Sequence, residues 1–133
     1  MENTIEEIIL IEDSEIDVFI NTKVIELMQI TERIVSLPSG EAALEYLSNS
    51  QKKFDKSYLI FLDIRMPKMD GFEFLESFQT LPEKVKQKIR IVMLSSTIDS
   101  NDLEKANANP FVLAFIPKPL TRDKIASLKL FLK

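Results

Sequence analysis

The sequence predicts an α/β fold in which helices cover both faces of a parallel sheet. Short apolar runs alternate along the chain with segments whose apolar residues recur at helical spacing, and this pairing occurs five times. Such alternation is typical of parallel sheets, because consecutive parallel strands need a crossover that a helix usually supplies. Polar residues follow four of the apolar runs. In a parallel sheet these positions share one edge, where this architecture places its ligand crevice.

The first two strand–helix pairs are predicted in the N-terminal part of the chain. Ile8–Ile11 is predicted to be a buried strand, and the helix after it has Asp13 or Ser14 as its N-cap. The apolar residues at helical spacing in that helix are Ile16, Ile20, Val24 and Leu27. Arg33–Leu37 is predicted as a weaker strand, and the small and apolar residues of Glu41–Ser48 predict a short helix.

The third and fourth pairs lie in the middle of the chain. Strands are predicted at Tyr58–Leu62 and Arg90–Leu94, both of which are short apolar runs. The helices that follow them are predicted over Gly71–Gln79 and Ser100–Ala108. The helix at Gly71–Gln79 is the better supported, because its apolar residues recur at regular helical spacing.

The fifth pair and two polar connections complete the prediction. Leu113–Ile116 is predicted as a strand, and Pro117 at its end suits an edge strand because it cannot donate a ladder hydrogen bond. The last helix is predicted after a Thr121 cap and runs through Leu132. Asn49–Ser57 is predicted as a loop, and Thr80–Lys88 as a long solvated connection with room for a turn of helix.

The composition excludes several classes of chemistry. The sequence contains no Cys, which rules out disulfides, thiol catalysis and Cys-ligated zinc. It contains no His, which removes Ser-His-Asp catalysis and imidazole metal ligands. Carboxylate, hydroxyl and amine chemistry remain, with hard oxygen ligands for a metal. The net charge of −4 argues against nucleic-acid binding by the surface as a whole, so no direct DNA binding is expected.

Length and hydropathy favour a single domain in the cytoplasm. The 133 residues, of which 45% are apolar, suit one compact domain that spans residues 1–133 without a second, effector domain. No apolar run approaches the ~20 residues that a membrane span requires. The acidic segment Met1–Glu7 lacks the pattern of a signal peptide. We therefore expect a cytoplasmic protein with no membrane association.

Carboxylates that follow two of the predicted strands suggest a metal site. Asp13 and Asp63 would lie a few Å apart and repel each other, which raises one pKa unless a divalent cation relieves the clash. Mg²⁺ prefers oxygen ligands and keeps several waters, so Asp13, Asp63 and the backbone carbonyl of Arg65 would make a typical site. Glu12 has a longer side chain and is expected to act through a water molecule.

The same residues suit phosphoryl transfer. A metal-bound carboxylate can act as a nucleophile and form an aspartyl phosphate, a role that Asp63 could take. Mg²⁺ would neutralise one phosphoryl oxygen, the Lys118 amine would neutralise another, and the Ser95 hydroxyl would donate to a third. Each residue alone also has an ordinary interpretation, as a helix cap, a turn residue, a loop hydroxyl or a solvated amine. Their joint occurrence at four strand ends favours the phosphoryl-transfer site.

Four sequence blocks resemble the receiver domain of two-component response regulators. The blocks are Ile11–Ser14, Leu62–Gly71, Leu94–Ser96 and Pro117–Leu120. They occur in order and at suitable spacing across nearly the whole chain, and the block Leu62–Gly71 is highly specific. The resemblance implies a stand-alone, chemotaxis-regulator-like receiver domain with a flavodoxin-like fold. That fold is a doubly wound, five-stranded parallel sheet of strand order 2-1-3-4-5, with five helices.

The resemblance also implies roles for the site residues and a cofactor, Mg²⁺. The residues in these roles are Asp63 (phosphoacceptor), Glu12 and Asp13 (acidic pair), Ser95 (switch hydroxyl), Lys118 (the family's lysine) and Phe115 (aromatic switch). The family's Lys-Pro bond is cis, so the bond between Lys118 and Pro119 is expected to be cis. Because the chain has no His, the phosphohistidine donor must be a histidine kinase or a histidine phosphotransfer protein. Output is expected through an unidentified partner protein.

The sequence departs from the family pattern without losing a required chemical group. Glu12 replaces the commoner Asp, and Ser95-Ser96 replaces the usual Thr-Ala. Phe115 replaces the more frequent Tyr, so its switch cannot use a phenol hydrogen bond. The stretch before Phe115 lacks the family's usual Gly, and the connection Thr80–Lys88 is longer than usual. The departures at Phe115, in the stretch before it and in the connection Thr80–Lys88 concern the output surface.

Three alternatives remain open at the level of sequence. A phosphorelay intermediate would pass the phosphoryl group from Asp63 to a histidine phosphotransfer protein. An aspartyl phosphatase of the haloacid dehalogenase type would have a second Asp two residues after the nucleophile, whereas Arg65 occupies that position. A non-phosphorylated scaffold would not need a complete acidic pocket. A domain that catalyses only its own phosphorylation and dephosphorylation, and not a turnover enzyme, is the preferred interpretation.

Overall fold

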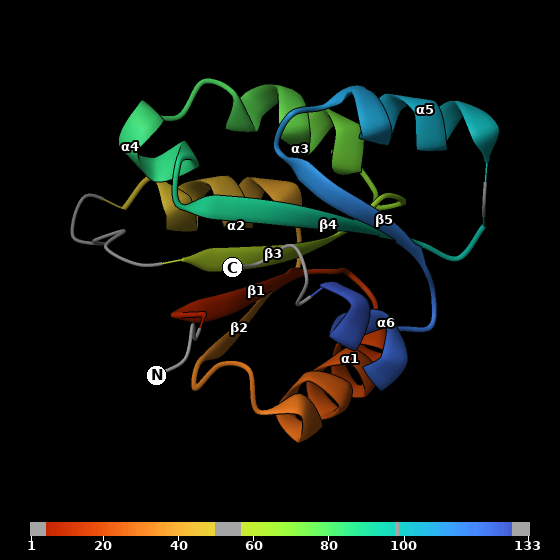
Figure 1. Ribbon diagram of the computed structural model, residues 1–133. Coiled ribbons are helices and arrows are strands. Elements are labelled where there is room, and N and C mark those ends of the chain that lie inside the picture. Colours follow the sequence, from red (N-terminus) through yellow and green to blue (C-terminus); the bar gives the residue numbers. More distant parts are fainter. Residues whose placement is uncertain (1–4, 50–56, 98, 129–133) are drawn as a thin grey trace.

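Five strands form one parallel sheet in the computed structural model, which describes residues 5–49, 57–97 and 99–128 (Figure 1). The strands are β1 (Glu7–Ile11), β2 (Ile34–Leu37), β3 (Tyr58–Asp63), β4 (Ile89–Ser95) and β5 (Val112–Pro117). Their order is β2-β1-β3-β4-β5, and neighbouring strands run parallel. The predicted α/β fold, its strand order and the edge position of the strand that ends at Pro117 are confirmed.

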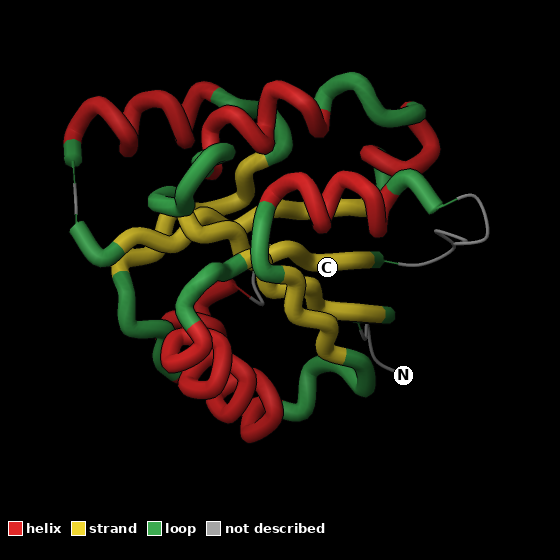
Figure 2. Tube along the Cα trace, turned by 180° about the vertical axis from the view of Figure 1, so that it is seen from behind, coloured by secondary structure: helices red, strands yellow, loops and turns green. Residues whose placement is uncertain are grey.

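Helices cover both faces of this sheet, as Figure 1 and the reverse view in Figure 2 show. Within the described residues they are α1 (Glu15–Met28), α2 (Gly40–Leu47), α3 (Gly71–Phe78), α4 (Glu83–Lys86), α5 (Ser100–Ala108) and α6 (Arg122–Leu128). α1 and α6 lie on one face, and α2, α3 and α5 lie on the other. The sequence predicts five helices; the sixth, α4, is one turn in the long connection and follows Pro82, whose fixed φ suits a helix start. Of the predicted loop and last helix, residues 50–56 and 129–132 lie outside the described part.

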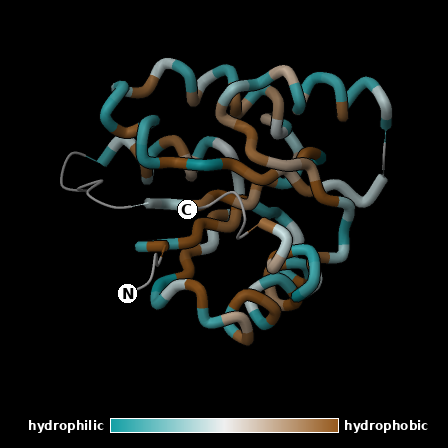
Figure 3. Tube along the Cα trace, in the orientation of Figure 1, coloured by the Kyte–Doolittle hydropathy of each residue, from teal (hydrophilic) through white to brown (hydrophobic). Residues whose placement is uncertain are grey.

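Two apolar clusters form the core, one on each face of the sheet. Successive side chains of a strand point to opposite faces. β1 therefore contributes Ile9 and Ile11 to the cluster beneath α2 and α3, and Ile8 and Leu10 to the cluster beneath α1 and α6. Figure 3 shows the central strands as largely brown, apolar segments. Because both faces of these strands are buried, their sequences are continuous apolar runs, which is what made them recognisable.

The apolar stripe that predicts α1 is not its buried face. Its buried residues are Asn21 and Ile25, with Val24 packed partly against the core. The large apolar residues exposed on α1 are Ile16, Phe19, Ile20 and Leu27, which we call the α1 apolar strip. The helix has apolar residues around most of its circumference, so helical spacing alone cannot select the buried side. Packing of α1 against α6 and the sheet selects it.

Local hydrogen bonds define where the helices beside the site begin. Ser14, rather than Asp13, caps α1, because its hydroxyl accepts a hydrogen bond from the Asp17 N–H at 3.3 Å. The Thr121 hydroxyl accepts from the Lys124 N–H at 3.2 Å, as the predicted cap of the last helix requires. Since the cap of α1 is Ser14, the Asp13 carboxylate is not used to start the helix and remains at the end of β1.

Gly71 allows α3 to pack directly against the end of β3. Its N–H donates to the Ile64 carbonyl at 2.9 Å. A Cβ at this position would lie 3.0 Å from the Asp63 carbonyl oxygen and 3.0 Å from Ile64 Cα. These are backbone atoms, which cannot move aside as the end of a flexible side chain could. Glycine at this position therefore sets how closely α3 approaches the residue that ends β3.

Candidate functional site

The strands deliver polar residues to one edge of the sheet. Asp63 ends β3 and Ser95 ends β4, and these two strands are hydrogen-bonded neighbours. Glu12 and Asp13 follow β1, which pairs with β3 on its other side, and Lys118 follows β5. All of these positions are at the carboxyl ends of parallel strands, where doubly wound folds bind their ligands. The structure thus brings together the residues that the sequence singled out.

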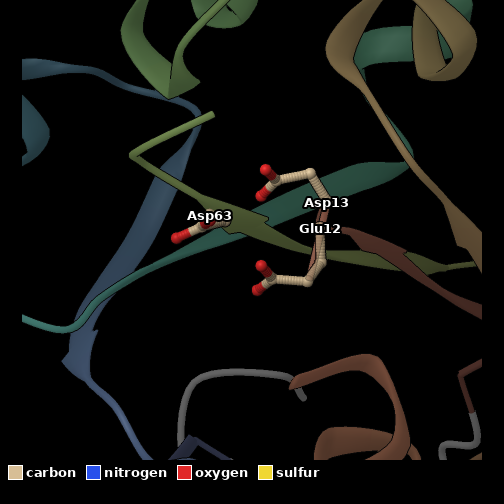
Figure 4. A group of neighbouring side chains, drawn as sticks. All are labelled: Glu12, Asp13 and Asp63. Atoms are coloured by element: carbon tan, nitrogen blue, oxygen red, sulfur yellow. The ribbon is translucent and has the colours of Figure 1, made fainter. Parts of the chain in front are cut away.

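Three carboxylates form an acidic cluster that consists of Glu12, Asp13 and Asp63 (Figure 4). One oxygen atom from each residue lies within 4.8 Å of the others. Glu12 and Asp63 are each only 4% exposed, whereas Asp13 is exposed to solvent. Figure 4 shows the Glu12 and Asp13 side chains leaving the end of β1 toward the side on which Asp63 lies. The cluster therefore combines two buried carboxylates with one that solvent can reach.

Lys118 places its ammonium group among these carboxylates. The Nζ atom lies 3.0 Å from Oε1 of Glu12 and 3.2 Å from Oδ1 of Asp63. A third contact, 2.8 Å to Oδ2 of Asp17 in α1, is the shortest and has hydrogen-bond geometry. The sequence analysis did not identify Asp17. Its only signal in the sequence is an acidic residue one helical turn after Asp13.

Burial and charge shift the pKa values of these groups. Burial raises the pKa of Glu12 to about 7, against the opposing contact with Lys118. Burial also raises the pKa of Asp63 above its ordinary value, although Lys118 favours its charged form. Burial alone would lower the pKa of Lys118, but its contacts with Asp17, Glu12 and Asp63 outweigh that effect and raise it. Lys118 is therefore cationic at neutral pH, and the carboxylates around it outnumber it.

The Ser95 hydroxyl is engaged within its own loop. It is buried, donates to the Thr97 carbonyl at 2.6 Å and accepts from the Thr97 N–H at 3.2 Å. A group bound on Asp63 would therefore receive the Ser95 proton only after the hydroxyl rotated. The Ser95 carbonyl accepts from the Lys118 N–H at 2.8 Å, which ties the loop after β5 to the end of β4. The bond between Lys118 and Pro119 is cis, as expected.

Phe115 lies on the edge strand, close to the polar residues. It stands opposite Met93 of β4 in the sheet register, two residues before the pairing of Ser95 with Pro117. Its half-buried ring packs against the apolar cluster beneath α2 and α3. The structure thus puts the candidate aromatic residue on the strand next to Ser95, with part of its ring still open to solvent.

Arg65 connects the loop after β3 to α5. Its Nη2 atom lies 2.7 Å from Oδ2 of Asp102, a residue of α5 that is only 5% exposed. The sequence analysis used Arg65 only for its backbone carbonyl and as the residue in place of a second Asp, and it gave Asp102 no role. Because position 65 is arginine, its side chain adds no carboxylate to the site, unlike the second Asp of a haloacid dehalogenase-type phosphatase.

A comparison with protein families identifies the fold and its general chemistry. The profile of response regulator receiver domains matches residues 8–128. The chain belongs to this family. The receiver domain is similar to a probable methanogenesis regulatory protein of Methanothrix harundinacea, with 31% identity over 121 residues that cover 89% of this chain and 75% of that protein.

Solved structures similar to this receiver domain support the same assignment. A two-component response regulator from Cytophaga hutchinsonii has 32% sequence identity and a TM-score of 0.88, and the match covers 97% of each chain. A response regulator receiver protein from Dyadobacter fermentans has 34% identity and a TM-score of 0.86, over 96% of this chain and 97% of that one. Receiver domains accept a phosphoryl group on an aspartate and bind Mg²⁺ at an acidic pocket. None of the helices within residues 5–49, 57–97 and 99–128 combines the length and the apolar character that a membrane span requires.

The acidic cluster of this receiver domain fits a magnesium ion. Oε1 of Glu12 is buried and has no hydrogen-bond partner among the described residues, although the Lys118 ammonium lies 3.0 Å away as a charge. Carboxylate oxygens are the ligands that Mg²⁺ prefers, and Asp13 keeps the cluster open to the water molecules that this ion retains. A second cation would also relieve the excess negative charge that burial makes unfavourable at Glu12 and Asp63.

We expect Mg²⁺ to bind more tightly as the pH rises from 6 to 8. The pKa of Glu12 is raised to about 7, so below that pH the group is mostly neutral and must release its proton to face the ion as an anion. Linkage to one proton changes the affinity by up to about tenfold per pH unit below the pKa. Isothermal titration calorimetry in two buffers of different ionisation enthalpy measures both the dissociation constant and the proton release.

Glu12→Gln is the matched control for this dependence. The amide preserves size but cannot titrate, so most of the pH dependence between 6 and 7 should disappear. An affinity of the unmodified protein that does not change over this range, or a Glu12→Gln variant with the full dependence, would contradict the assignment of the titration to Glu12.

Proposed function

We propose that this receiver domain takes a phosphoryl group from a phosphohistidine onto Asp63, with Mg²⁺, and thereby changes its binding to an output partner. The observation that carries the proposal is the position of Asp63. Its buried carboxylate ends β3 within the acidic cluster and lies 3.2 Å from the Lys118 ammonium. Since the sequence contains no His, the donor histidine lies outside this domain, and we propose a histidine kinase or a histidine phosphotransfer protein as the donor.

The proposed transfer exchanges one bond to phosphorus for another. An oxygen of the Asp63 carboxylate attacks the phosphorus atom, and the bond between phosphorus and the donor imidazole nitrogen breaks. The electron pair of that bond stays on the imidazole nitrogen. Lys118 is positioned to neutralise one phosphoryl oxygen, and Ser95 can donate to another after it leaves Thr97. When bound, Mg²⁺ would supply further charge neutralisation at the phosphoryl oxygens.

Oxygen atoms at the carboxyl ends of β1 and β3 would hold the ion. Asp13 and Asp63 are the proposed direct ligands, together with the backbone carbonyl of Arg65, and Glu12 acts through a water molecule. The exposure of Asp13 supports its role as a direct ligand, because the water molecules that Mg²⁺ retains need access to solvent. The ammonium of Lys118 already lies beside Glu12 and favours a more distant position for the ion on that side.

The proposed output face consists of α5, β5 and α6. Rotation of the Ser95 hydroxyl toward the phosphoryl group would vacate space that the half-buried ring of Phe115 can fill. Phe115 has no hydroxyl, so inward packing hides apolar surface without leaving a polar group unpaired. The Arg65–Asp102 ion pair is a second link, because it joins the loop after Asp63 directly to α5.

The biological setting follows from the same proposal. The net charge of −4 favours a protein over DNA as the partner of this domain. We place it in the cytoplasm, where it would meet a kinase. It changes its own phosphorylation state and does not turn over an external substrate. Onward transfer from Asp63 to a histidine phosphotransfer protein would make it a relay instead.

Asp63→Asn is expected to abolish phosphorylation. Intact-mass measurement after incubation with acetyl phosphate and Mg²⁺ should show one added phosphoryl group on the unmodified protein and none on the variant, because the amide is not a nucleophile. Asp70→Asn, which changes a carboxylate that caps α3 outside the acidic cluster, is the control and should retain labelling. Labelling of Asp63→Asn at the level of the unmodified protein would overturn the assignment.

Beryllofluoride, a phosphoryl mimic, should shift backbone amide signals along α5, β5 and α6 as well as around Asp63. These signal changes are expected because Ser95 and Phe115, and the Arg65–Asp102 ion pair, link Asp63 to this face. The underlying change of population requires differential stabilisation of only a few kcal/mol. Heteronuclear NMR spectra with and without the mimic measure it. Changes restricted to the loops around Asp63 would show that the domain carries a phosphoryl group without switching this face.

A further inference from the structure

Three carboxylates already surround the ammonium group of Lys118. An ammonium has three N–H donors, and three carboxylate oxygens lie within 3.2 Å of Lys118 Nζ. They belong to Glu12, Asp63 and Asp17. A phosphoryl group on Asp63 would therefore compete with these carboxylates for the ammonium, including Asp17, whose contact with Lys118 has hydrogen-bond geometry.

The contact with Asp17 differs from the other two. It is the shortest, at 2.8 Å, and it has hydrogen-bond geometry, whereas Oε1 of Glu12 has no hydrogen-bond partner among the described residues. The Asp17 side chain is 35% exposed, but those of Glu12 and Asp63 are 3% and 6% exposed. Water can therefore replace Lys118 at Asp17, while the buried carboxylates would lose their counter-ion without compensation.

Asp17 is also held in place from a different element than the acidic cluster. It lies in the first turn of α1, where its N–H donates to the Ser14 cap. Its carboxylate thus draws Lys118 toward α1, and the acidic cluster draws it toward the sheet. The two attractions act on one flexible side chain, so strengthening one weakens the other.

We infer that Asp17 is a positioning residue that holds Lys118 in the unphosphorylated domain and releases it when a phosphoryl group occupies Asp63. The inference rests on the proposed phosphorylation of Asp63. The phosphoryl oxygens are stronger, doubly charged competitors for the ammonium, and Asp17 is the acceptor that solvent can satisfy. Asp17 therefore opposes phosphorylation by a modest amount and sets how readily Lys118 engages the phosphoryl group.

Release of Lys118 by Asp17 also transmits the phosphorylation state of Asp63 to α1. The carboxylate lies in the same turns of α1 as Ile16, Phe19 and Ile20, three members of the α1 apolar strip. Once Lys118 leaves, this surface gains an uncompensated negative charge beside exposed apolar residues. α1 is thus a second surface that differs between the two states, on the opposite face of the sheet from α5.

The first test uses the unphosphorylated protein and the side-chain ¹⁵N signal of Lys118. Its ammonium protons should be protected from exchange with water in the unmodified protein, and Asp17→Asn should speed their exchange and move the signal. Glu15→Gln is the matched control, because Glu15 is an exposed carboxylate of the same turn and lines the cleft beside Glu12 and Asp13. Equal effects of the two variants on Lys118 would overturn the inference.

The second test measures the affinity for beryllofluoride in the presence of Mg²⁺. Asp17→Asn should bind the mimic about three- to fivefold more tightly, as expected for loss of a competing, partly exposed ion pair. Glu15→Gln should change the affinity less. In a Lys118→Met background the effect of Asp17→Asn should vanish, because Asp17 acts through the amine.

The outcomes separate this inference from the proposed function. Unchanged or weaker binding by Asp17→Asn, or a gain that persists in the Lys118→Met background, would overturn the role of Asp17 and leave phosphorylation of Asp63 intact. Failure of the unmodified protein to bind the mimic or to be phosphorylated would instead refute the proposed function. The Lys118 signal in the free protein would then still report whether Asp17 holds the amine.

Discussion

The ammonium group of Lys118 is the counter-ion on which the carboxyl edge of the sheet depends. Glu12 directly follows β1 and Asp63 ends the neighbouring β3, so the sheet register keeps their buried carboxylates close together. Without a nearby positive charge, two buried carboxylates this close together would repel each other, and the folded protein would favour the protonated form of one of them. Lys118 reaches both from β5 at 3.0 and 3.2 Å, and so makes this arrangement of strand ends stable.

One cation does not balance the site, and this imbalance explains its chemistry. The pKa of Glu12 is raised to about 7 even with Lys118 beside it, which shows that the pocket still favours additional positive charge. Mg²⁺ supplies that charge when it binds, and the ion and Lys118 together suit the oxygens of a phosphoryl group. The two donors that a phosphoryl group would need are engaged elsewhere, Ser95 with Thr97 and Lys118 with Asp17. The proposed phosphorylation of Asp63 would therefore require the pocket to rearrange, and we propose that an output partner detects this rearrangement.

The sequence was sufficient to predict the features that depend on the positions of the strands. Buried parallel strands are continuous apolar runs, and their carboxyl ends must share an edge, so the position of Asp63 beside Asp13 and Lys118 followed from order alone. Contacts made by helical side chains could not be predicted in this way. The buried side of α1, the Asp17 contact and the Arg65–Asp102 pair depend on how each helix is rotated against the sheet. That rotation is decided by tertiary packing, which spacing along one helix does not encode.

The free energy of unfolding of Lys118→Met, measured with and without Mg²⁺, tests the central role of the ammonium most directly. If Lys118 and Mg²⁺ neutralise the same carboxylates, removal of the amine should weaken the metal-free protein and strengthen Mg²⁺ binding. Mg²⁺ should then raise the unfolding free energy of the variant by more than that of the unmodified protein. Lys124→Met, which removes an amine that contacts the Pro117 and Pro119 carbonyls, is the control. An equal or smaller effect of Mg²⁺ on Lys118→Met would contradict this account.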